Sequence, residues 1–398
     1  MTRKILMLAP SSIPTYGAEA IVNKKLLTAL DKSNKFEIDL ISQRVKYLHY
    51  PIEQTDISLN SIHIIDNDLS VTPKLIWEHI KAYFLFGITF KAIHWAVKAL
   101  PIAEELIANN NYDYILTKDA PSFVLGHYLQ QKYRIKWVAT WNDPYPGIKY
   151  PVPYGQGVDA KGNIFDRMII KVMRKADIHI FPSERIRDYM LRYLDVKRDN
   201  TVVVPHVILE TDITNRLDKS QLRILHSGTL QSPRSPKTFL QAFSRFKENF
   251  PDSSISVDIL GIMEKEDVEL INILKLQDDV HFLAPVTYSE SLEILARYHI
   301  ALIIEADCEE GIFLPTKVTD FMQYRKPIFA VSPKLGVLND LYKEGYVNYF
   351  SDVRSVDDIY NSLVRIYNDF TNHRIDEKGK IADSVFSEKT IVNQYFNL

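Results

Sequence analysis

The sequence predicts an α/β protein built from two parallel sheets, each covered by helices on both faces. Short apolar runs alternate with helical stretches along nearly the whole chain of 398 residues, a pattern typical of repeated strand, helix, strand units. A polar stretch at residues 212–220 interrupts this alternation near the middle. With 46% hydrophobic residues, a chain of this length can form more than one core. We therefore expect an N-terminal domain of residues 1–211 and a C-terminal domain of residues 212–385.

The N-terminal half opens with a strand, a loop and a helix. Residues 4–9 form a short apolar run, and residues 19–30 have their apolar side chains on one helical face. We expect one long helical stretch at residues 74–108. Further strands are predicted at residues 36–42, 62–66, 114–118, 137–141, 178–182 and 201–204.

The C-terminal half repeats the same alternation. Residues 356–370 and 390–397 have helical periodicity, and another helix is predicted to begin near Pro236. Strands are predicted at residues 222–227, 255–260, 280–283, 300–304, 327–331 and 346–350. Ligands of parallel sheets bind beyond the carboxyl ends of strands, so the residues that follow each run are candidates for a site.

Composition excludes several classes of protein. A net charge of -2 argues against a general nucleic-acid binder. Cys308 is the only cysteine, which rules out an intrachain disulfide and a cysteine-based zinc cluster. The aromatic-rich apolar run at residues 82–90 is too short to span a bilayer, and the N-terminus is read as a strand and not as a signal peptide. We therefore expect a soluble, cytoplasmic protein.

Residues 309–331 combine charges, a helix start and a strand. Thr316 is suited to cap a helix that ends before Pro327, where a β-branched run predicts a buried strand. A helix N-terminus attracts anions, and Lys317 adds a full positive charge there. Asp320 lies one turn further along on the same side, so the pair is suited to a phosphate next to a sugar diol. An ordinary capped helix in an α/β core would have the same pattern.

This stretch resembles the donor-nucleotide motif of GT-B glycosyltransferases, closest to the retaining glycosyltransferase family 4. This sequence departs from the family pattern at two positions. Ile312 stands at the strict position of the first acid, and Arg325 replaces the glycine that usually ends the helix. A residue other than glycine resists the left-handed cap conformation, so the helix must end differently or bear about 1 kcal/mol of strain. The residues that match in order are Glu310, Gly311, Leu314, Pro315, Asp320, Lys326 and Pro327.

Two stretches of the N-terminal half resemble the same family. The loop before the first helix resembles its Gly-Gly-x-Glu loop, with Tyr16 in place of the first glycine and Gly17 as the second. A tight turn would also explain Gly17. The segment after the predicted strand at residues 137–141 has Asn142 where many members have histidine, followed by Asp143. An asparagine can bind a sugar hydroxyl but cannot relay a proton, and Asp143 can equally be a turn residue before a proline.

The start of the C-terminal half resembles the family pattern of Gly-Arg-Leu followed by a lysine. Gly228 keeps the glycine, Thr229 replaces the arginine, and Arg234 stands at the lysine. One expected cation is therefore missing, and we infer that Lys317 supplies it. Arg234 could also be a solvated loop residue.

The resemblance implies a GT-B fold, in which two Rossmann-like domains with parallel sheets face a central cleft and a C-terminal helix, residues 386–398, packs back on the first domain. It implies a retaining hexosyl transferase that takes a UDP- or GDP-sugar as co-substrate, needs no other cofactor and no metal, and acts in polysaccharide biosynthesis on a saccharide or lipid-linked acceptor. Asp320 is assigned to the ribose of the donor. The residues assigned to catalysis and the transferred sugar are Asn142, Asp143 and Glu310. The residues assigned to the donor diphosphate are Gly17, Gly228, Arg234, Thr316 and Lys317.

Residues 74–100 are candidates for a contact with the inner face of the cytoplasmic membrane. Four lysines and six large aromatic residues lie between Lys74 and Lys98, a composition that suits a membrane interface or an apolar acceptor. Packing inside the domain would produce a similar pattern.

Two other functions remain open from the sequence. A sugar-nucleotide epimerase of GT-B architecture would need a carboxylate and a partner acid around the sugar ring. A degenerate GT-B protein that only binds a partner or polysaccharide is favoured by Ile312, Thr229 and Asn142.

Overall fold

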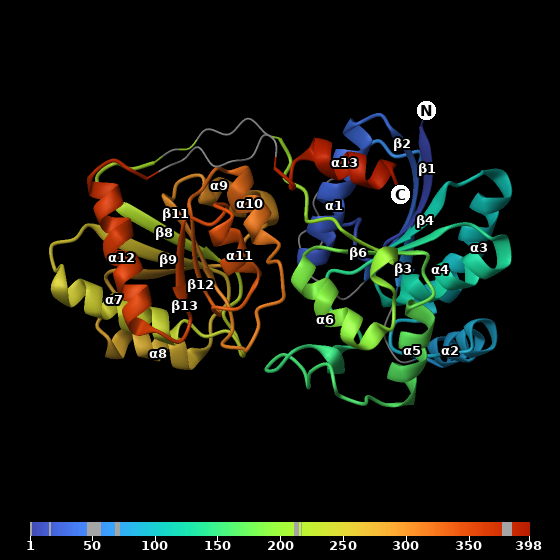
Figure 1. Cartoon of the computed structure of the whole chain (residues 1–398), viewed down its shortest axis with the longest axis horizontal. Coiled ribbons are helices and arrows are strands. Elements are labelled where there is room, and N and C mark those ends of the chain that lie inside the picture. Colours follow the sequence, from blue (N-terminus) through green and yellow to red (C-terminus); the bar gives the residue numbers. More distant parts are fainter. Residues whose placement is uncertain are drawn as a thin grey trace. The chain divides into compact units, whose positions relative to one another are not determined.

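The computed structural model describes residues 2–15, 17–45, 57–67, 72–210, 215, 217–375 and 384–398. The chain divides into two compact units, which Figure 1 shows. Unit 1 comprises Met1–Tyr150, Gly155–Leu209 and Glu388–Leu398, and unit 2 comprises Pro151–Tyr154 and Glu210–Ser387. The replaced glycine at Tyr16 and the predicted boundary between residues 211 and 212 lie outside the described residues.

Seven parallel strands form the sheet of unit 1, in the order β3-β2-β1-β4-β5-β6-β7. Every run predicted to be a strand in this half is one, with ends that differ by at most three residues. Their near-continuous apolar character follows from burial on both faces of the sheet. The strands are β1 (Arg3–Leu8), β2 (Phe36–Val45), β3 (Ser61–Asn67), β4 (Tyr114–Thr117), β5 (Trp137–Thr140), β6 (Ile178–Phe181) and β7 (Thr201–Val203).

Helices connect these strands and cover the sheet of unit 1. They are α1 (Gly17–Lys32), α2 (Pro73–Phe86), α3 (His94–Asn109), α4 (Ala120–Tyr133), η1 (Gly147–Lys149), α5 (Ile164–Met173), α6 (Glu184–Leu194), η2 (Arg198–Asn200) and α13 (Glu388–Phe396).

The single helical stretch predicted at residues 74–108 was wrong, because two helices lie there. Gly87 has a φ of 71°, a left-handed conformation that glycine adopts without strain, and its N–H donates to the Tyr83 carbonyl and ends α2. The two helices differ in exposure: Trp77 of α2 is 57% exposed, whereas Trp95 of α3 is fully buried. The aromatic residues of this region therefore belong to two different environments.

The C-terminal helix α13 packs on unit 1. The Tyr114 hydroxyl donates to the Tyr395 carbonyl oxygen at 2.9 Å, and the rings of Phe36 and Phe396 lie edge to face with centroids 6.0 Å apart. Ile391, Val392 and Tyr395 join the core of the first sheet. These contacts tie the last residues of the chain to its first strands.

Unit 2 contains a second parallel sheet, in the order β10-β9-β8-β11-β12-β13. The predicted start of its last strand was three residues too early, because the amides of Tyr346 and Val347 donate to the Leu341 carbonyl at the end of α11. The strands are β8 (Leu222–Ser227), β9 (Ile255–Leu260), β10 (Val280–Leu283), β11 (Ile300–Ile304), β12 (Ile328–Ser332) and β13 (Tyr349–Asp352). The helices are α7 (Lys237–Asn249), α8 (Lys265–Ile273), α9 (Tyr288–Leu295), α10 (Lys317–Gln323), α11 (Val337–Lys343) and α12 (Val356–Thr371).

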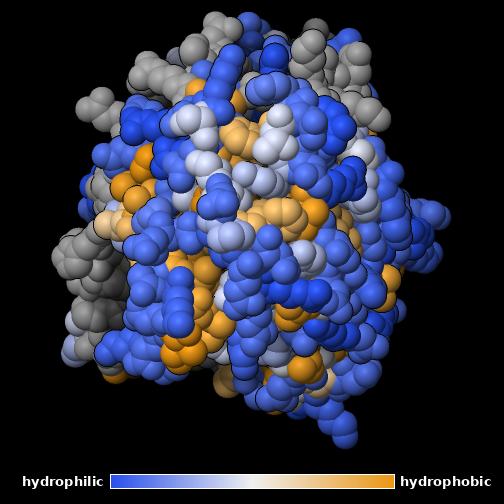
Figure 2. All heavy atoms as spheres, turned by 90° about the vertical axis from the view of Figure 1, so that its left-hand side faces the viewer, coloured by the Kyte–Doolittle hydropathy of each residue, from blue (hydrophilic) through white to orange (hydrophobic). Residues whose placement is uncertain are grey.

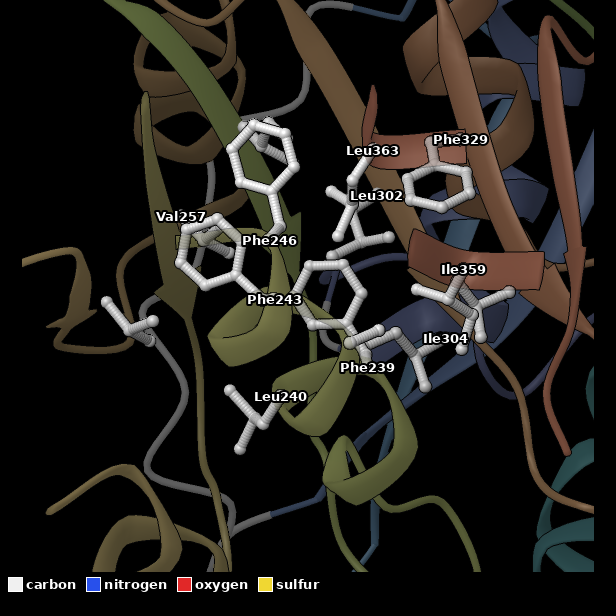
Figure 3. Packing of buried hydrophobic residues seen from close by; sticks show 14 of the residues in the cluster. Phe239, Leu240, Phe243, Phe246, Val257, Leu302, Ile304, Phe329, Ile359 and Leu363 are labelled. Atoms are coloured by element: carbon white, nitrogen blue, oxygen red, sulfur yellow. The ribbon is translucent and has the colours of Figure 1, made fainter. Parts of the chain in front are cut away.

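An aromatic core joins α7 and α12 to the second sheet. Figure 3 shows Phe239, Phe243 and Phe246 pointing from α7 toward Leu302, Ile304 and Phe329 of the strands, with Ile359 and Leu363 of α12 beside them. The rings of Phe239 and Phe243 stack with centroids 6.1 Å apart. Spacing of three and four residues places all three rings on one face of α7, so this helix holds the sheet from which the candidate site is built.

Helix α10 ends with the strained residue that the sequence indicated. Arg325 has a φ of 50° and occupies the left-handed region in which the family pattern has glycine. The Lys326 amide then donates to the Phe321 carbonyl at 2.9 Å, which closes the helix. Of the two outcomes predicted for this departure, the structure has the strained one.

Candidate functional site

The strand order of each sheet reverses at one place, and candidate residues gather there. In unit 2 the reversal lies between β8 and β11, and in unit 1 it lies between β1 and β4. At such a point the helices that follow the two neighbouring strands lie on opposite faces of the sheet. A crevice is therefore left beyond the carboxyl ends of these strands. The residues that follow β8, β11, β1 and β4 are therefore placed to bind ligands.

Unit 1 has a pocket of about 480 Å³ at this reversal. Glu19 of α1, Asp119 after β4 and Asn142 and Asp143 after β5 all line it. Its apolar lining includes Phe90, Phe123, Trp141, Tyr145 and Tyr150. Polar groups among aromatic rings are suited to a sugar, whose hydroxyls need hydrogen bonds and whose ring faces stack on aromatic side chains.

Two amide groups hold the carboxylate of Glu19 in this pocket. Asn142 Nδ2 donates to Glu19 Oε2 at 2.6 Å, and Asn23 Nδ2 donates to Glu19 Oε1 at 3.1 Å. Burial raises the pKa of the Glu19 carboxyl, while the bond from Asn142 and the charge of Lys118 oppose the rise. The predicted catalytic residue Asn142 is thus bound through its nitrogen, which directs its carbonyl oxygen away from Glu19.

Charged groups after β4 are buried beside Glu19. Burial lowers the pKa of the Lys118 ammonium to about 8, and the Glu19 charge partly opposes this. Burial, together with the charge of the neighbouring Glu19 carboxylate, raises the pKa of the Asp119 carboxyl to about 7. The pocket therefore contains ionisable groups that change charge near neutral pH.

Asp143, the other candidate after β5, is exposed at the pocket wall. Burial, followed by the charge of Asp143, raises the pKa of the Tyr150 hydroxyl well above its ordinary value. Tyr150 therefore stays protonated as a hydrogen-bond donor. Asn142 and Asp143, both predicted to be site residues, line the same pocket.

In unit 2, Lys317 and Gly228 come together from α10 and from the end of β8. Lys317 Nζ lies 3.3 Å from Ser227 Oγ, and a Cβ atom on Gly228 would lie 3.0 Å from Lys317 Cε. Gly228 has a φ of 145°, a conformation open only to glycine among common residues. Burial lowers the pKa of Lys317, and the Asp320 charge opposes this.

The predicted role of the Gly228 amide needs a correction. Its N–H donates to the Leu260 carbonyl at 2.8 Å. Two residues further along, the Leu230 N–H donates to the Ile262 carbonyl, also at 2.8 Å. The loop thus extends the pairing of β8 with β9, and Gly228 N–H is not turned toward a ligand. What Gly228 provides is room beside Lys317.

Arg234 lies in the same part of unit 2 and pairs with a carboxylate that the sequence analysis did not single out. Arg234 Nε is 3.4 Å from Oε2 of Glu305, the residue after β11. This carboxylate raises the pKa of Arg234, and burial raises the pKa of Glu305. Tyr154, which belongs to unit 2, donates to Glu305 at 3.3 Å. Arg234 is therefore no freely solvated loop residue.

The loop before α10 departs from one prediction. Thr316 takes a helical conformation and makes no side-chain capping bond, because the turn begins one residue earlier with Val318 N–H donating to the Pro315 carbonyl. Ile312, which stands where the family pattern has its first acid, is fully buried, as suits an apolar side chain. Glu310 is half-buried in this loop, where Gly311 pairs with Gly336.

Asp320 is bound by a tyrosine from another helix. The Tyr288 hydroxyl at the start of α9 donates to Asp320 Oδ1 at 2.7 Å, and Asp320 is only 7% exposed. The contact fixes the carboxylate in the first turn of α10, one turn from Lys317.

The structure divides the predicted site residues between the units. Gly17, Asn142 and Asp143 lie in unit 1, and Gly228, Arg234, Glu310, Thr316, Lys317 and Asp320 lie in unit 2.

The sequence analysis missed the roles of Glu19, Lys118, Asp119, Tyr288 and Glu305. Glu19 ends the loop motif, and Lys118, Asp119 and Glu305 lie at strand ends, so the strand-end rule could have found the last three. Nothing in the local sequence indicates Tyr288.

Comparisons with known proteins agree with this architecture. A sequence model of Glycosyltransferase Family 4 matches residues 66–208. Sucrose-phosphate synthase from Thermosynechococcus elongatus shares the fold with a TM-score of 0.67 and 16% identity, covering 99% of this chain and 98% of that one. HepE of Anabaena, in a complex with UDP and glucose, has a TM-score of 0.67 and 14% identity, covering 99% and 98%. No curated protein sequence matches the chain.

A third solved structure, the apo form of the lipopolysaccharide outer core galactosyltransferase WaaB, has a TM-score of 0.58 and 12% identity, covering 99% of both chains. The protein therefore has the GT-B fold, with two Rossmann-like domains, as its motifs led us to expect, and its resemblance to family 4 is supported over residues 66–208. The family match covers the N-terminal half, whereas the motifs that suggested the family are mainly in the other half.

Proposed function

We propose that the protein is a glycosyltransferase that moves a sugar from a nucleotide diphosphate sugar to an acceptor bound by unit 1. The observation that carries the proposal is the convergence of Arg234, Lys317 and Asp320 where the strand order of unit 2 reverses. Two cations suit a diphosphate, and a fixed carboxylate suits the ribose diol. The UDP and glucose complex of HepE supports UDP-glucose as the first donor to test.

In the proposed reaction the bond between the anomeric carbon and the diphosphate oxygen breaks, and the acceptor hydroxyl oxygen bonds to that carbon. The acceptor proton leaves with the nucleoside diphosphate. Negative charge develops on the departing diphosphate in the transition state, and the positive charges of Arg234 and Lys317 stabilise it there. Retention of configuration and independence of metal are proposals that rest on the family resemblance.

The pocket of unit 1 supports the acceptor role. The Asn142 carbonyl oxygen and the Asp143 carboxylate can accept hydrogen bonds from sugar hydroxyls, while aromatic residues line the remaining wall. An acceptor hydroxyl held by such oxygens keeps its oxygen lone pairs available for the anomeric carbon.

Calorimetry followed by a transfer assay tests the proposal. Wild-type protein is titrated with UDP-glucose and with GDP-mannose, and the donor that binds is incubated with candidate saccharides and with EDTA. Formation of UDP or GDP together with a glycosylated product supports the function. A new sugar nucleotide formed without any acceptor would instead show an epimerase, and binding without either product would show a binding protein.

The exposed face of α2 supports an acceptor at a membrane surface. Ile76, Trp77, Ile80 and Phe84 recur on one face of this helix and are between 41% and 82% exposed. Glu78 points the other way and is buried, with Lys98 Nζ 3.8 Å from its carboxylate. Aromatic side chains favour a membrane interface, and the exposed Lys74 and Lys81 would be attracted to anionic head groups.

Apolar exposure elsewhere is more scattered. Figure 2 shows one side of the molecule, on which several separate hydrophobic patches lie in a mainly hydrophilic surface. Single exposed apolar residues of unit 2, such as Ile273 and Phe282, are ordinary for a protein surface. No helix in the described ranges is both long and apolar enough to cross a membrane. We propose that α2 lies on the membrane surface and brings the pocket to a lipid-linked saccharide.

A further inference from the structure

A buried histidine next to the proposed diphosphate site has a defined tautomer. His226 lies in β8 and is 6% exposed. Its Nδ1 is 3.1 Å from the Leu302 carbonyl oxygen of β11. Because a carbonyl only accepts, Nδ1 carries the hydrogen, and in the neutral ring Nε2 has a lone pair and no hydrogen.

The Nε2 atom faces the space above Gly228. A Cβ atom built on Gly228 would lie 3.7 Å from His226 Nε2 and 3.0 Å from Lys317 Cε, so the imidazole and the lysine flank the same position. Nε2 is buried and has no hydrogen-bond partner among the described residues. A buried acceptor without a donor is costly, and a ligand that supplies the donor would remove the cost.

The ring stays neutral at this position. Burial, together with the positive charges of Lys317 and Arg234, lowers the pKa of His226 to about 3. Nε2 is therefore an acceptor near neutral pH. The phosphate oxygens of a nucleotide sugar are acceptors as well and cannot pair with it. The hydrogen donors of such a ligand on either side of the diphosphate are the hydroxyls of its two sugars, the ribose and the transferred sugar.

We propose that His226 Nε2 accepts a hydrogen bond from a hydroxyl group of the donor's transferred sugar. This inference rests on the proposed function and adds to it a residue that distinguishes the nucleotide sugar from the free nucleotide. The ribose is assigned to Asp320 on α10, which leaves the sugar on the other side of the diphosphate for His226. The absence of a side chain at Gly228 provides the room for that sugar.

A matched pair of variants tests this contact. His226→Met and His226→Gln have side chains of similar length and volume, but only glutamine offers an oxygen acceptor. Binding of UDP and of UDP-glucose to the full-length protein is measured by calorimetry. We expect His226→Met to weaken UDP-glucose binding about tenfold and UDP binding less than about twofold, and His226→Gln to recover most of the loss.

UDP serves as the internal measure of an intact site in both variants. His179→Met is the matched control, because His179 is also a buried strand histidine whose Nε2 has no partner in the described part of the chain, but it lies in unit 1. Equal weakening of UDP and UDP-glucose by His226→Met would mean that the ring acts on the diphosphate or only on the fold, and would overturn the proposal. Unchanged UDP-glucose binding would also overturn it. If the wild type binds UDP but not UDP-glucose or GDP-mannose, the donor assignment fails and this inference fails with it.

Discussion

Asn142 donates a hydrogen bond from Nδ2 to Oε2 of Glu19 across 2.6 Å, which joins the loop after β5 to the first turn of α1. The contact fixes which end of the Asn142 amide faces the pocket. Because Asn23 binds the other carboxylate oxygen, Glu19 cannot turn away without losing both bonds. Glu19 is thus a positioning residue for the proposed catalytic Asn142.

Replacing Glu19 by glutamine should impair transfer without affecting donor binding. The neutral amide of Glu19→Gln removes a charge-assisted bond and allows the Asn142 amide to rotate. We expect kcat/KM for the acceptor to fall about tenfold to a hundredfold, while UDP binding to unit 2 stays within about twofold. Glu105→Gln, on the exposed side of α3, is the control. A loss of UDP binding in Glu19→Gln would contradict a role confined to the acceptor pocket.

Asp119 should make stability fall as pH rises toward neutrality. Burial raises the pKa of Asp119 to about 7, above the ordinary value of an unfolded aspartate, so the folded state holds the proton over a wider range. Stability from this group is present below the unfolded pKa and is lost as pH rises through about 7. Asp119→Asn should therefore be more stable than wild type at pH 8 by at least about 1 kcal/mol, and equal to it near pH 4. Denaturant unfolding at the two pH values measures the difference. A constant difference at both values would show that Asp119 does not titrate in this way.

Arg234 and Lys317 should differ in what their removal does to stability. Both alanine variants should bind UDP at least about tenfold more weakly, because each loses a charge at the diphosphate. Only Arg234→Ala leaves the buried Glu305 without its cation, so its unfolding temperature should fall more than that of Lys317→Ala.

The double variant Arg234→Ala, Glu305→Gln separates the two effects. It should regain stability, since the unpaired charge is gone, and should remain weak in UDP binding. Recovery of UDP binding would show that Arg234 acts only as the partner of Glu305.

Asp320 should bind the nucleotide part of the donor. Asp320→Ala should weaken binding of UDP and UDP-glucose alike, whereas Glu310→Ala should weaken only UDP-glucose. Tyr288→Phe removes the bond that holds Asp320 Oδ1 and should have a smaller effect of the same kind, about threefold to tenfold. Calorimetry with both ligands measures the series. Unchanged UDP binding in Asp320→Ala would remove the ribose assignment.

The sequence was sufficient for most of the fold because the central strands of both sheets are buried on both faces. Runs such as residues 255–260 and 300–304 coincide with β9 and β11, since burial requires continuous apolar residues. The break at Gly87 was missed because its left-handed conformation divides a pattern that stays apolar on either side. The start of β13 was missed because two amides of the apolar run complete α11.

The site was less predictable because its bonds join elements distant in the chain. Tyr288 reaches Asp320, and Glu305 reaches Arg234, across separations that no local pattern encodes. The local expectation that Thr316 caps α10 failed because the turn starts at Pro315. Lys317 was found from the expected helix start, and Gly228 from the end of the strand before it. The structure brings the two residues together at the reversal of the strand order.

The last prediction concerns the exposed face of α2. Wild-type protein should sediment with vesicles of phosphatidylglycerol and phosphatidylcholine at low salt, and less so as salt is added, because Lys74 and Lys81 are attracted to anionic head groups. Trp77→Ser with Phe84→Ser removes the two most exposed aromatic side chains of the helix and should reduce binding at least about tenfold. Lys81→Glu with Lys91→Glu should weaken binding mainly at low salt.

A matched double variant controls for the general loss of exposed apolar surface. Ile273→Ser with Phe282→Ser replaces residues of unit 2 that are 74% and 43% exposed, and it should bind vesicles as the wild type does. If the wild type stays in the supernatant at low salt, α2 is no membrane surface. A concentration-dependent dimer that Trp77→Ser with Phe84→Ser abolishes would then assign this face to a second copy of the chain. Sedimentation equilibrium on the same samples distinguishes the two occupants, because only self-association raises the mass in the absence of lipid.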